Sequence, residues 1–81
     1  MLPDMETPKP GIYHHFKDAS KEYELLGVAF HTETEEPMAV YRPLYEGAIA
    51  PLFVRPLGLF MGQVDKPEIG YQGPRFVWVR E

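Results

Sequence analysis

The residues best suited to chemistry lie between His31 and Tyr45, in the stretch HTETEEPMAVYRPLY. On an extended strand alternate side chains share a face, so His31, Glu33 and Glu35 would point the same way. One imidazole with two carboxylates could bind a metal ion, or form an acid/base pair in which a glutamate orients the histidine. The same residues are typical of a solvated hairpin turn, in which Thr34 can bond the local backbone. We favour a turn or a ligand-binding role, and predict no metal, cofactor or catalytic residue.

Familiar catalytic motifs are absent from the sequence. The chain has no cysteine, which excludes disulfides, thiolate metal sites and cysteine nucleophiles. The only serine, Ser20, does not stand in a nucleophile elbow, and the glycines lack the spacing of a phosphate-binding loop. His14 and His15 are neighbours and would face opposite sides of a strand. We therefore expect a protein that is not an enzyme.

A second set of candidates combines arginines with tyrosines. Tyr41, Arg42 and Tyr45 fall in one predicted strand, Arg55 falls in the next, and Arg75 opens the last. Opposite side chains on paired strands are about 5 Å apart, so a cluster is possible. Either the arginines pair with acids and hold the fold together, or the tyrosines stack on a planar ligand whose charge the arginines bind. The predicted ligand-binding residues are Tyr13, His31, Glu33, Thr34, Tyr41, Arg42, Tyr45 and Arg55.

The charge distribution narrows the class of ligand. The net charge is −4, and all four arginines lie after residue 41, in the less acidic part of the chain. Overall acidity argues against non-specific binding to duplex nucleic acid, which needs a basic surface. Arginines with aromatic residues suit a nucleotide or a single-stranded nucleic acid. The alternative is an interaction module that binds an extended peptide of a protein partner; a His/Glu enzyme, acid–base or metal-dependent, ranks last.

Short apolar runs separated by turn signals predict the elements that would position these residues. We expect a flexible tail over residues 1–9 and one domain over 10–81. Strands are predicted at 12–16, 23–31, 38–45, 52–57 and 75–80, with a bulge or bend at Gly27, a short helical turn near 58–62 and a loop over 63–74. This pattern favours an all-β fold, a small five-stranded SH3-like barrel, with an OB-like barrel second. The predicted core consists of Phe16, Leu26, Val28, Phe30, Val54, Phe60, Phe76 and Trp78.

Six blocks of the sequence resemble a bacterial family of unknown function, number 1653. The resemblance covers about residues 11–77. Phe53 departs from it, where a tryptophan is expected, and residues 48–51 resemble a local insertion. The resemblance implies a small, mostly β, SH3-like protein with no established activity. The blocks are YHHFK at 13–17, YELLGVA at 23–29, HTETE at 31–35, VYRPLY at 40–45, VRPL at 54–57 with Phe60, and PRF at 74–76.

The sequence also sets expectations about location. No apolar run approaches the roughly 18–20 residues that span a bilayer. The first residues, MLPDMETPKPG, lack the basic and then apolar order of a signal peptide. We expect a cytoplasmic protein that does not bind membranes and is a monomer or a weak homodimer.

Overall fold

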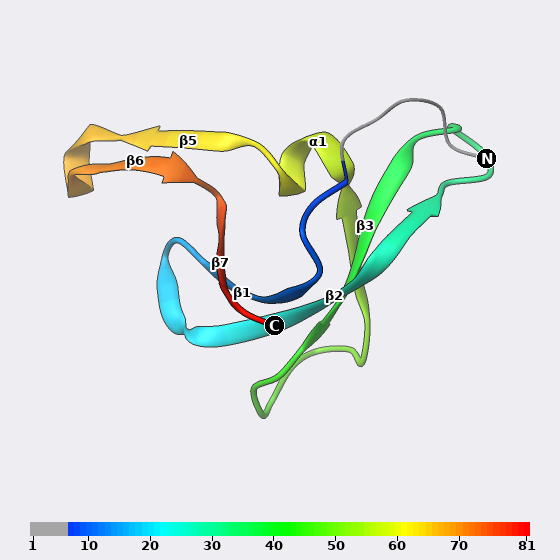
Figure 1. Ribbon diagram of the computed structural model, residues 1–81, viewed down its shortest axis with the longest axis horizontal. Helices are drawn as coiled ribbons and strands as arrows, with labels where there is room; N and C mark the ends of the chain where they lie inside the picture. Colours follow the sequence, from blue (N-terminus) through cyan, green and yellow to red (C-terminus); the bar gives the residue numbers. More distant parts are fainter. Residues whose placement is uncertain (1–6) are drawn as a thin grey trace.

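The computed structural model describes residues 7–81, which are mostly β-strand, as predicted (Figure 1). A five-stranded antiparallel sheet has the strand order β4-β3-β2-β1-β7, and β5 and β6 form a separate two-stranded sheet. The strands are β1 (Gly11–His15), β2 (Asp18–Phe30), β3 (Pro37–Pro43), β4 (Phe53–Pro56), β5 (Gln63–Lys66), β6 (Tyr71–Pro74) and β7 (Phe76–Arg80); the helices are α1 (Leu57–Phe60) and the 3-10 helix η1 (Pro67–Ile69).

The sheet has an inner face, which carries the buried side chains, and an outer face. Leu25 and Tyr41 are opposite one another on β2 and β3, and their buried side chains mark the inner face. Between Leu25 and Gly27 the register shifts, which confirms the predicted bulge at Gly27. The bulge moves Leu26 out of the expected alternation, and its side chain is half exposed. As a result Leu25, rather than the predicted Leu26, contributes to the core.

The core is aromatic and lies under α1. Phe60 is 2% exposed and its ring stacks on Phe76 at 4.4 Å between centroids. Leu57 and Phe60 are three positions apart in α1 and both are buried, so this single turn covers the inner face. Its position at 57–60 agrees with the helical turn predicted near 58–62. The buried cluster comprises Tyr13, Leu25, Ala39, Tyr41, Leu57, Phe60 and Phe76.

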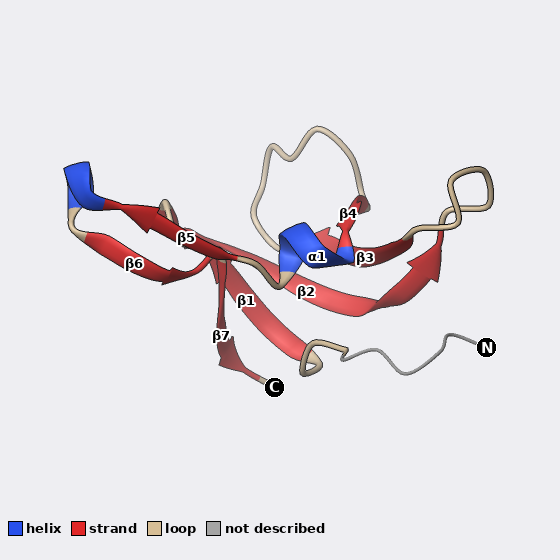
Figure 2. Cartoon of the chain, turned by 90° about the horizontal axis from the view of Figure 1, so that it is seen from above, coloured by secondary structure: helices blue, strands red, loops and turns tan. Residues whose placement is uncertain are grey.

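The predicted barrel is not closed in the described part of the chain. The sheet has two edges, β4 and β7, which exchange no backbone hydrogen bonds with each other. Residues 63–74 form β5, η1 and β6 rather than the predicted loop, and this arm extends away from the five-stranded sheet (Figures 1 and 2). Proline and glycine do mark this segment, but they stand in η1 and at the end of β6. The arm was therefore not predicted, because the apolar alternation in each of its strands is too short to recognise.

Several predicted core residues are instead exposed. Leu26 and Val54 lie on the outer face of the open sheet. Phe30 and Trp78 lie on the inner face by register, but beyond the residues that form the core. Leu26 is 50% exposed, Phe30 47%, Val54 60% and Trp78 36%. Phe60 and Phe76 are buried as predicted, and Val28 packs partly against them. The core instead includes Tyr13 and Tyr41, which were not among the predicted core residues.

Two further expectations concern the ends and the membrane. Residues 1–6 of the predicted tail lie outside the described residues; Thr7 to Lys9 follow, and the Lys9 carbonyl accepts a hydrogen bond from the Tyr13 hydroxyl. Across residues 7–81, none of the helices has the length and apolar character needed to cross a bilayer.

Candidate anion-binding site

The loop that follows β2 uses His31 to hold its own backbone. The Nδ1 atom of His31 accepts hydrogen bonds from the backbone N–H groups of Glu33 and Thr34, at 3.2 and 3.3 Å. The His31 carbonyl accepts from the Glu35 N–H at 2.7 Å, and the Thr34 hydroxyl donates to the Glu36 carboxylate at 3.2 Å. All of these residues are exposed. The imidazole therefore caps a hairpin turn.

This arrangement does not bring the predicted His31–Glu33–Thr34 set together as a site. The Nδ1 lone pair of His31 is occupied by backbone donors, and Glu33 contributes its N–H rather than its carboxylate. Within residues 7–81 no group of three or more histidines and carboxylates could hold a metal ion. The polar groups of the loop form hydrogen bonds with one another.

Arg42 lies on the outer face, away from the tyrosines with which it was grouped. It is directly opposite Glu24 on β2, and its Nη2 forms an ion pair with the Glu24 carboxylate. The Arg42 side chain is 53% exposed. An exposed pair of this kind contributes little to stability, and the structural interpretation fits Arg42.

The predicted tyrosines occupy different environments. Tyr41 is 4% exposed, and edge-to-face packing against Tyr23 and Phe76 makes it part of the core. Tyr13 is 6% exposed, and burial raises the pKa of its hydroxyl. Tyr45 is half-buried, packs edge-to-face on Tyr23 and has the Lys21 ammonium 5.2 Å from its ring centroid. Of the three, Tyr45 alone keeps a substantial exposed surface.

Arg55 is the predicted residue that does join a cluster. It is opposite the buried Ala39, so its side chain lies on the inner face. Its Cζ atom is 5.2 Å from the ring centroid of Phe76. His15 is opposite Phe76 in the β1–β7 pair and packs edge-to-face on the same ring, also at 5.2 Å. A guanidinium and an imidazole therefore share one aromatic ring.

Arg75 completes this cluster and was not among the predicted binding residues. Its backbone is fixed on both sides, because its N–H donates to Gly62 at 3.0 Å and its carbonyl accepts from Phe16 at 2.9 Å. Its Nε atom is buried and has no hydrogen-bond partner among the described residues. Buried donors in native proteins are nearly always paired, so this atom calls for an acceptor.

The charged groups that act on His15 are all positive. Burial lowers the pKa of His15, and the positive charges of Arg55 and Arg75 lower that pKa further, with smaller effects from Lys17 and His14. The nearest acid by register is Asp18, opposite His15, and its Oδ1 accepts hydrogen bonds from the N–H and hydroxyl of Ser20. Among residues 7–81 the side-chain ion pairs are Arg42–Glu24 and Arg80–Glu22, so neither Arg55 nor Arg75 has a carboxylate partner there.

Aromatic rings border the cluster on two sides. Phe16 follows His15 at 4.7 Å between ring centroids and stacks on Tyr71 of the β5–β6 arm at 5.1 Å. On the other side stands Tyr23, whose pKa is raised by burial and by the Tyr45 hydroxyl, with Arg55 opposing. The His15–Arg55–Arg75 cluster thus combines positive charge with half-buried aromatic rings, and it can bind an anion attached to a planar group.

The predicted binding residues include Arg55; Arg75 was grouped with the candidate arginines but was not among them, and His15 was left out. His15 shared its strand with His14, and only the β1–β7 pairing shows which of the two faces inward. Arg75 stands before β7, and its backbone partners, Gly62 and Phe16, come from two segments that are far from it in the sequence. The sequence signal that could have drawn attention to Arg75 was its position directly before Phe76, a predicted core residue.

Comparison with known proteins agrees with the blocks noted in the sequence. The profile of a family described as "Protein of unknown function (DUF1653)" matches residues 11–80. A crystal structure of a protein belonging to DUF1653 from Bordetella bronchiseptica is similar, with 36% sequence identity and a TM-score of 0.77, over 89% of this chain and 87% of that chain. No curated protein matches the sequence. The chain therefore belongs to the DUF1653 family.

Proposed function

We propose that this chain is a non-enzymatic binding module whose His15–Arg55–Arg75 cluster takes the phosphate of a nucleotide or of a single-stranded nucleic acid. One observation carries the proposal: the Arg55 guanidinium and the His15 imidazole converge on Phe76, the charge of Arg75 also acts on His15, and neither arginine is paired with a carboxylate in residues 7–81. Uncompensated positive charge on a half-buried surface costs stability, and a bound anion offsets that cost.

The ligand is expected to carry a planar group beside its phosphate. Tyr45, Tyr23 and Phe16 border the cluster, and a nucleobase can stack on such rings. The SH3-like character predicted from the sequence belongs to the same proposal, since small barrels of that kind bind their ligands on aromatic-lined surfaces. Arginine donors suit phosphate because their planar fork makes two parallel hydrogen bonds.

The test is an amide-shift NMR titration of the labelled chain with adenosine monophosphate, a short single-stranded DNA and inorganic phosphate. Shifts should concentrate at His15, Arg55 and Arg75. Arg55→Gln should weaken binding about tenfold or more, because one charge-assisted hydrogen bond contributes about 1.5–3 kcal/mol.

Arg42→Gln is the matched control, because it removes the same charge from the outer face and should leave binding within about twofold at moderate salt. Tighter binding of the nucleotide or the oligonucleotide than of inorganic phosphate would identify the planar group as part of the ligand. Equal loss of binding in Arg42→Gln and Arg55→Gln would contradict the proposal, since only net charge would then matter.

A further inference from the structure

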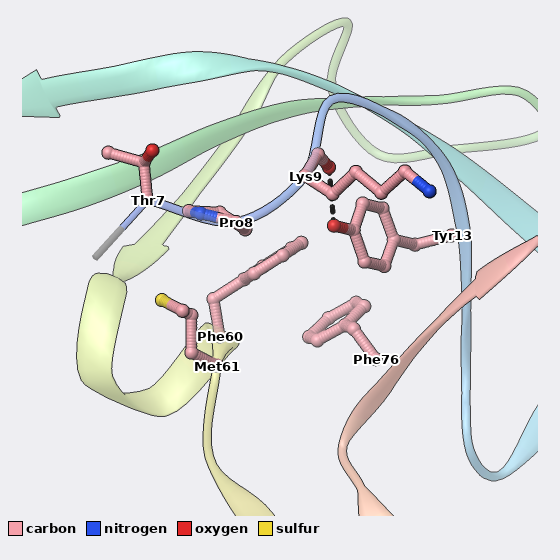
Figure 3. Close-up of a pocket in the computed structure, with 7 residues that line it drawn as sticks. All are labelled: Thr7, Pro8, Lys9, Tyr13, Phe60, Met61 and Phe76. Carbon is pink, nitrogen blue, oxygen red and sulfur yellow. Dashed lines mark hydrogen bonds between the residues drawn. The ribbon is translucent and has the colours of Figure 1, made fainter. Parts of the chain in front are cut away.

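The segment Thr7–Pro10 lies against the aromatic residues of β1 and β7 and is held by two side-chain donors. The Tyr13 hydroxyl donates to the Lys9 carbonyl, as Figure 3 shows. The Trp78 indole N–H donates to the Pro10 carbonyl at 3.1 Å. Two consecutive backbone carbonyls of a Thr-Pro-Lys-Pro sequence are thus bound by one tyrosine and one tryptophan.

The lysine between the two prolines adds a third contact. Its Nζ lies 3.7 Å from the centroid of the Trp78 ring, well within the range of a cation–π interaction. In Figure 3 the Lys9 side chain extends away from Phe60 and Met61. Trp78 therefore binds the segment through both its N–H and its ring face, which explains why this large apolar residue is not in the core.

Gly11 shows that the fit between the segment and Trp78 is close. Its φ is +138°, and a Cβ atom there would come within 2.5 Å of the Arg80 carbonyl oxygen and 2.7 Å of Trp78 Nε1. No other residue type can bring the chain onto Trp78 at this point.

Open space remains on both sides of the segment. One cavity of about 350 Å³ lies between Thr7–Lys9 and the side chains of Tyr13, Phe60, Met61 and Phe76 (Figure 3). A second, of about 230 Å³, lies between Thr7, Pro8 and Pro10 on one side and residues 25–28 of β2 on the other. The segment rests in a wider groove that it does not fill.

We infer that this groove, together with the adjoining Trp78 side chain, is a docking site for an extended peptide with a lysine between two prolines, and that Thr7–Pro10 occupies it in cis. Proline-rich peptides present carbonyl acceptors and lose little entropy on binding, and aromatic grooves with hydroxyl and indole donors recognise them in this way. The Thr7–Pro10 segment is bound in this way, with one tyrosine donor, one tryptophan donor and its own cation on the tryptophan ring.

The inference is independent of the proposed anion site, since it uses Tyr13 and Trp78 rather than the arginines. Because the cis segment is tethered next to the groove, its effective concentration is on the order of millimolar or higher, and a free peptide must displace it. Weakening the cis segment should therefore reveal the binding of a peptide in trans.

The experiment uses the labelled full chain, with the indole N–H of its single tryptophan as the NMR probe. The probe peptide is acetyl-Thr-Pro-Lys-Pro-Gly-amide. The triple substitution Pro8→Gly, Lys9→Gly and Pro10→Gly should shift the indole resonance without peptide, and the peptide should return it toward its original position. The triple variant should bind at least about fivefold more tightly than the unmodified chain, because the cis competitor is weakened.

Two controls identify the contacts. Trp78→Phe keeps a ring but removes the indole donor, and in the triple-variant background it should abolish peptide binding while the amide spectrum stays folded; the probe there is the Gly11 amide. A peptide with glutamate in place of lysine should bind more weakly, because its carboxylate is repelled by the ring face.

Binding that is no tighter in the triple variant, or equal binding of the glutamate peptide, would overturn the inference. If the triple variant does not fold, the unmodified chain is titrated with the lysine peptide to a concentration on the order of 10 mM. The Gly11 amide and the Trp78 indole must then shift as the cis segment is displaced, and their failure to shift would equally overturn it. Arg55→Gln should leave peptide binding unchanged.

Discussion

Arg55 lies over the ring of Phe76, with its Cζ 5.2 Å from the ring centroid, although the two residues come from opposite edge strands of one sheet. In a flat sheet four strand spacings of about 4.8 Å would separate β4 from β7 by about 19 Å. The five-stranded sheet is therefore curved so strongly that its two edges meet through side chains rather than through backbone hydrogen bonds. The candidate anion site is a product of that curvature.

The stacked pair Phe60–Phe76 should carry much of the stability. Phe60→Ala removes a ring that is 2% exposed, and its loss should lower the free energy of unfolding by about 3–5 kcal/mol. Leu59→Ala in the same helix is the control, because Leu59 is 53% exposed, and its effect should stay within about 0.5 kcal/mol. Urea denaturation of both variants checks the difference. Similar losses in the two would mean that α1 does not cover the core.

Gly11 and Gly58 should respond to alanine in opposite directions. Gly11→Ala places a Cβ at a positive φ and against the backbone of Arg80, so the free energy of unfolding should fall by about 1–3 kcal/mol. Gly58→Ala adds a methyl group to α1 with no atom within 4 Å, so it should raise the free energy of unfolding by about 0.4–1 kcal/mol. Thermal unfolding of both variants measures the two signs, and a tolerated alanine at Gly11 would refute the close fit described at Trp78.

His31 should behave as a turn-capping residue. His31→Ala leaves the N–H groups of Glu33 and Thr34 without their side-chain acceptor, so the free energy of unfolding should fall by about 1 kcal/mol. His31→Asn supplies a carbonyl oxygen in a similar position and should recover most of that loss. Chemical denaturation compares the two variants; a full loss in both would point to a role that needs an imidazole.

Stability should depend on pH through His15. Its pKa is lowered in the folded state, so the unfolded chain binds more protons at mildly acidic pH. Neutral His15 makes its full contribution to the free energy of unfolding above the unfolded-state pKa of about 6.5. That contribution is lost as the pH falls below this value toward the lower pKa of His15 in the folded state. His15→Gln should flatten the curve of unfolding free energy against pH in this window. An unchanged slope in the variant would show that another group causes the dependence.

Local sequence signals predicted the strands where the apolar runs were long. β2 and β3 contain the apolar runs LLGVAF at 25–30 and MAVY at 38–41, although β2 begins at Asp18 rather than at the predicted residue 23. Gly27 marked the bulge because a glycine inside a strand signals a break in register. The β5–β6 arm was missed because each strand has only four residues and glycine and proline stand within and beside them. Short strands are held by tertiary contacts such as the Phe16–Tyr71 stack, which composition does not reveal.

The candidate site was predictable only in part, for a geometric reason. The sequence grouped arginines with aromatic residues, but Arg42 and Arg55 lie on opposite faces of the sheet, and only the register separates them. His15 and Arg75 approach Arg55 because the sheet curves, and curvature is a property of the whole sheet rather than of any one strand. Tyr41 was expected to stack on a ligand, yet its position opposite Leu25 places it in the core.

The most direct test of the anion site is the NMR titration of the His15 imidazole with and without adenosine monophosphate. A phosphate bound between Arg55 and Arg75 offsets the charges that lower the pKa of His15, so the nucleotide should raise that pKa. The rise should be smaller in Arg55→Gln and should persist in Arg42→Gln. A His15 pKa that stays the same at every soluble nucleotide concentration would contradict the assignment of this cluster as the binding site.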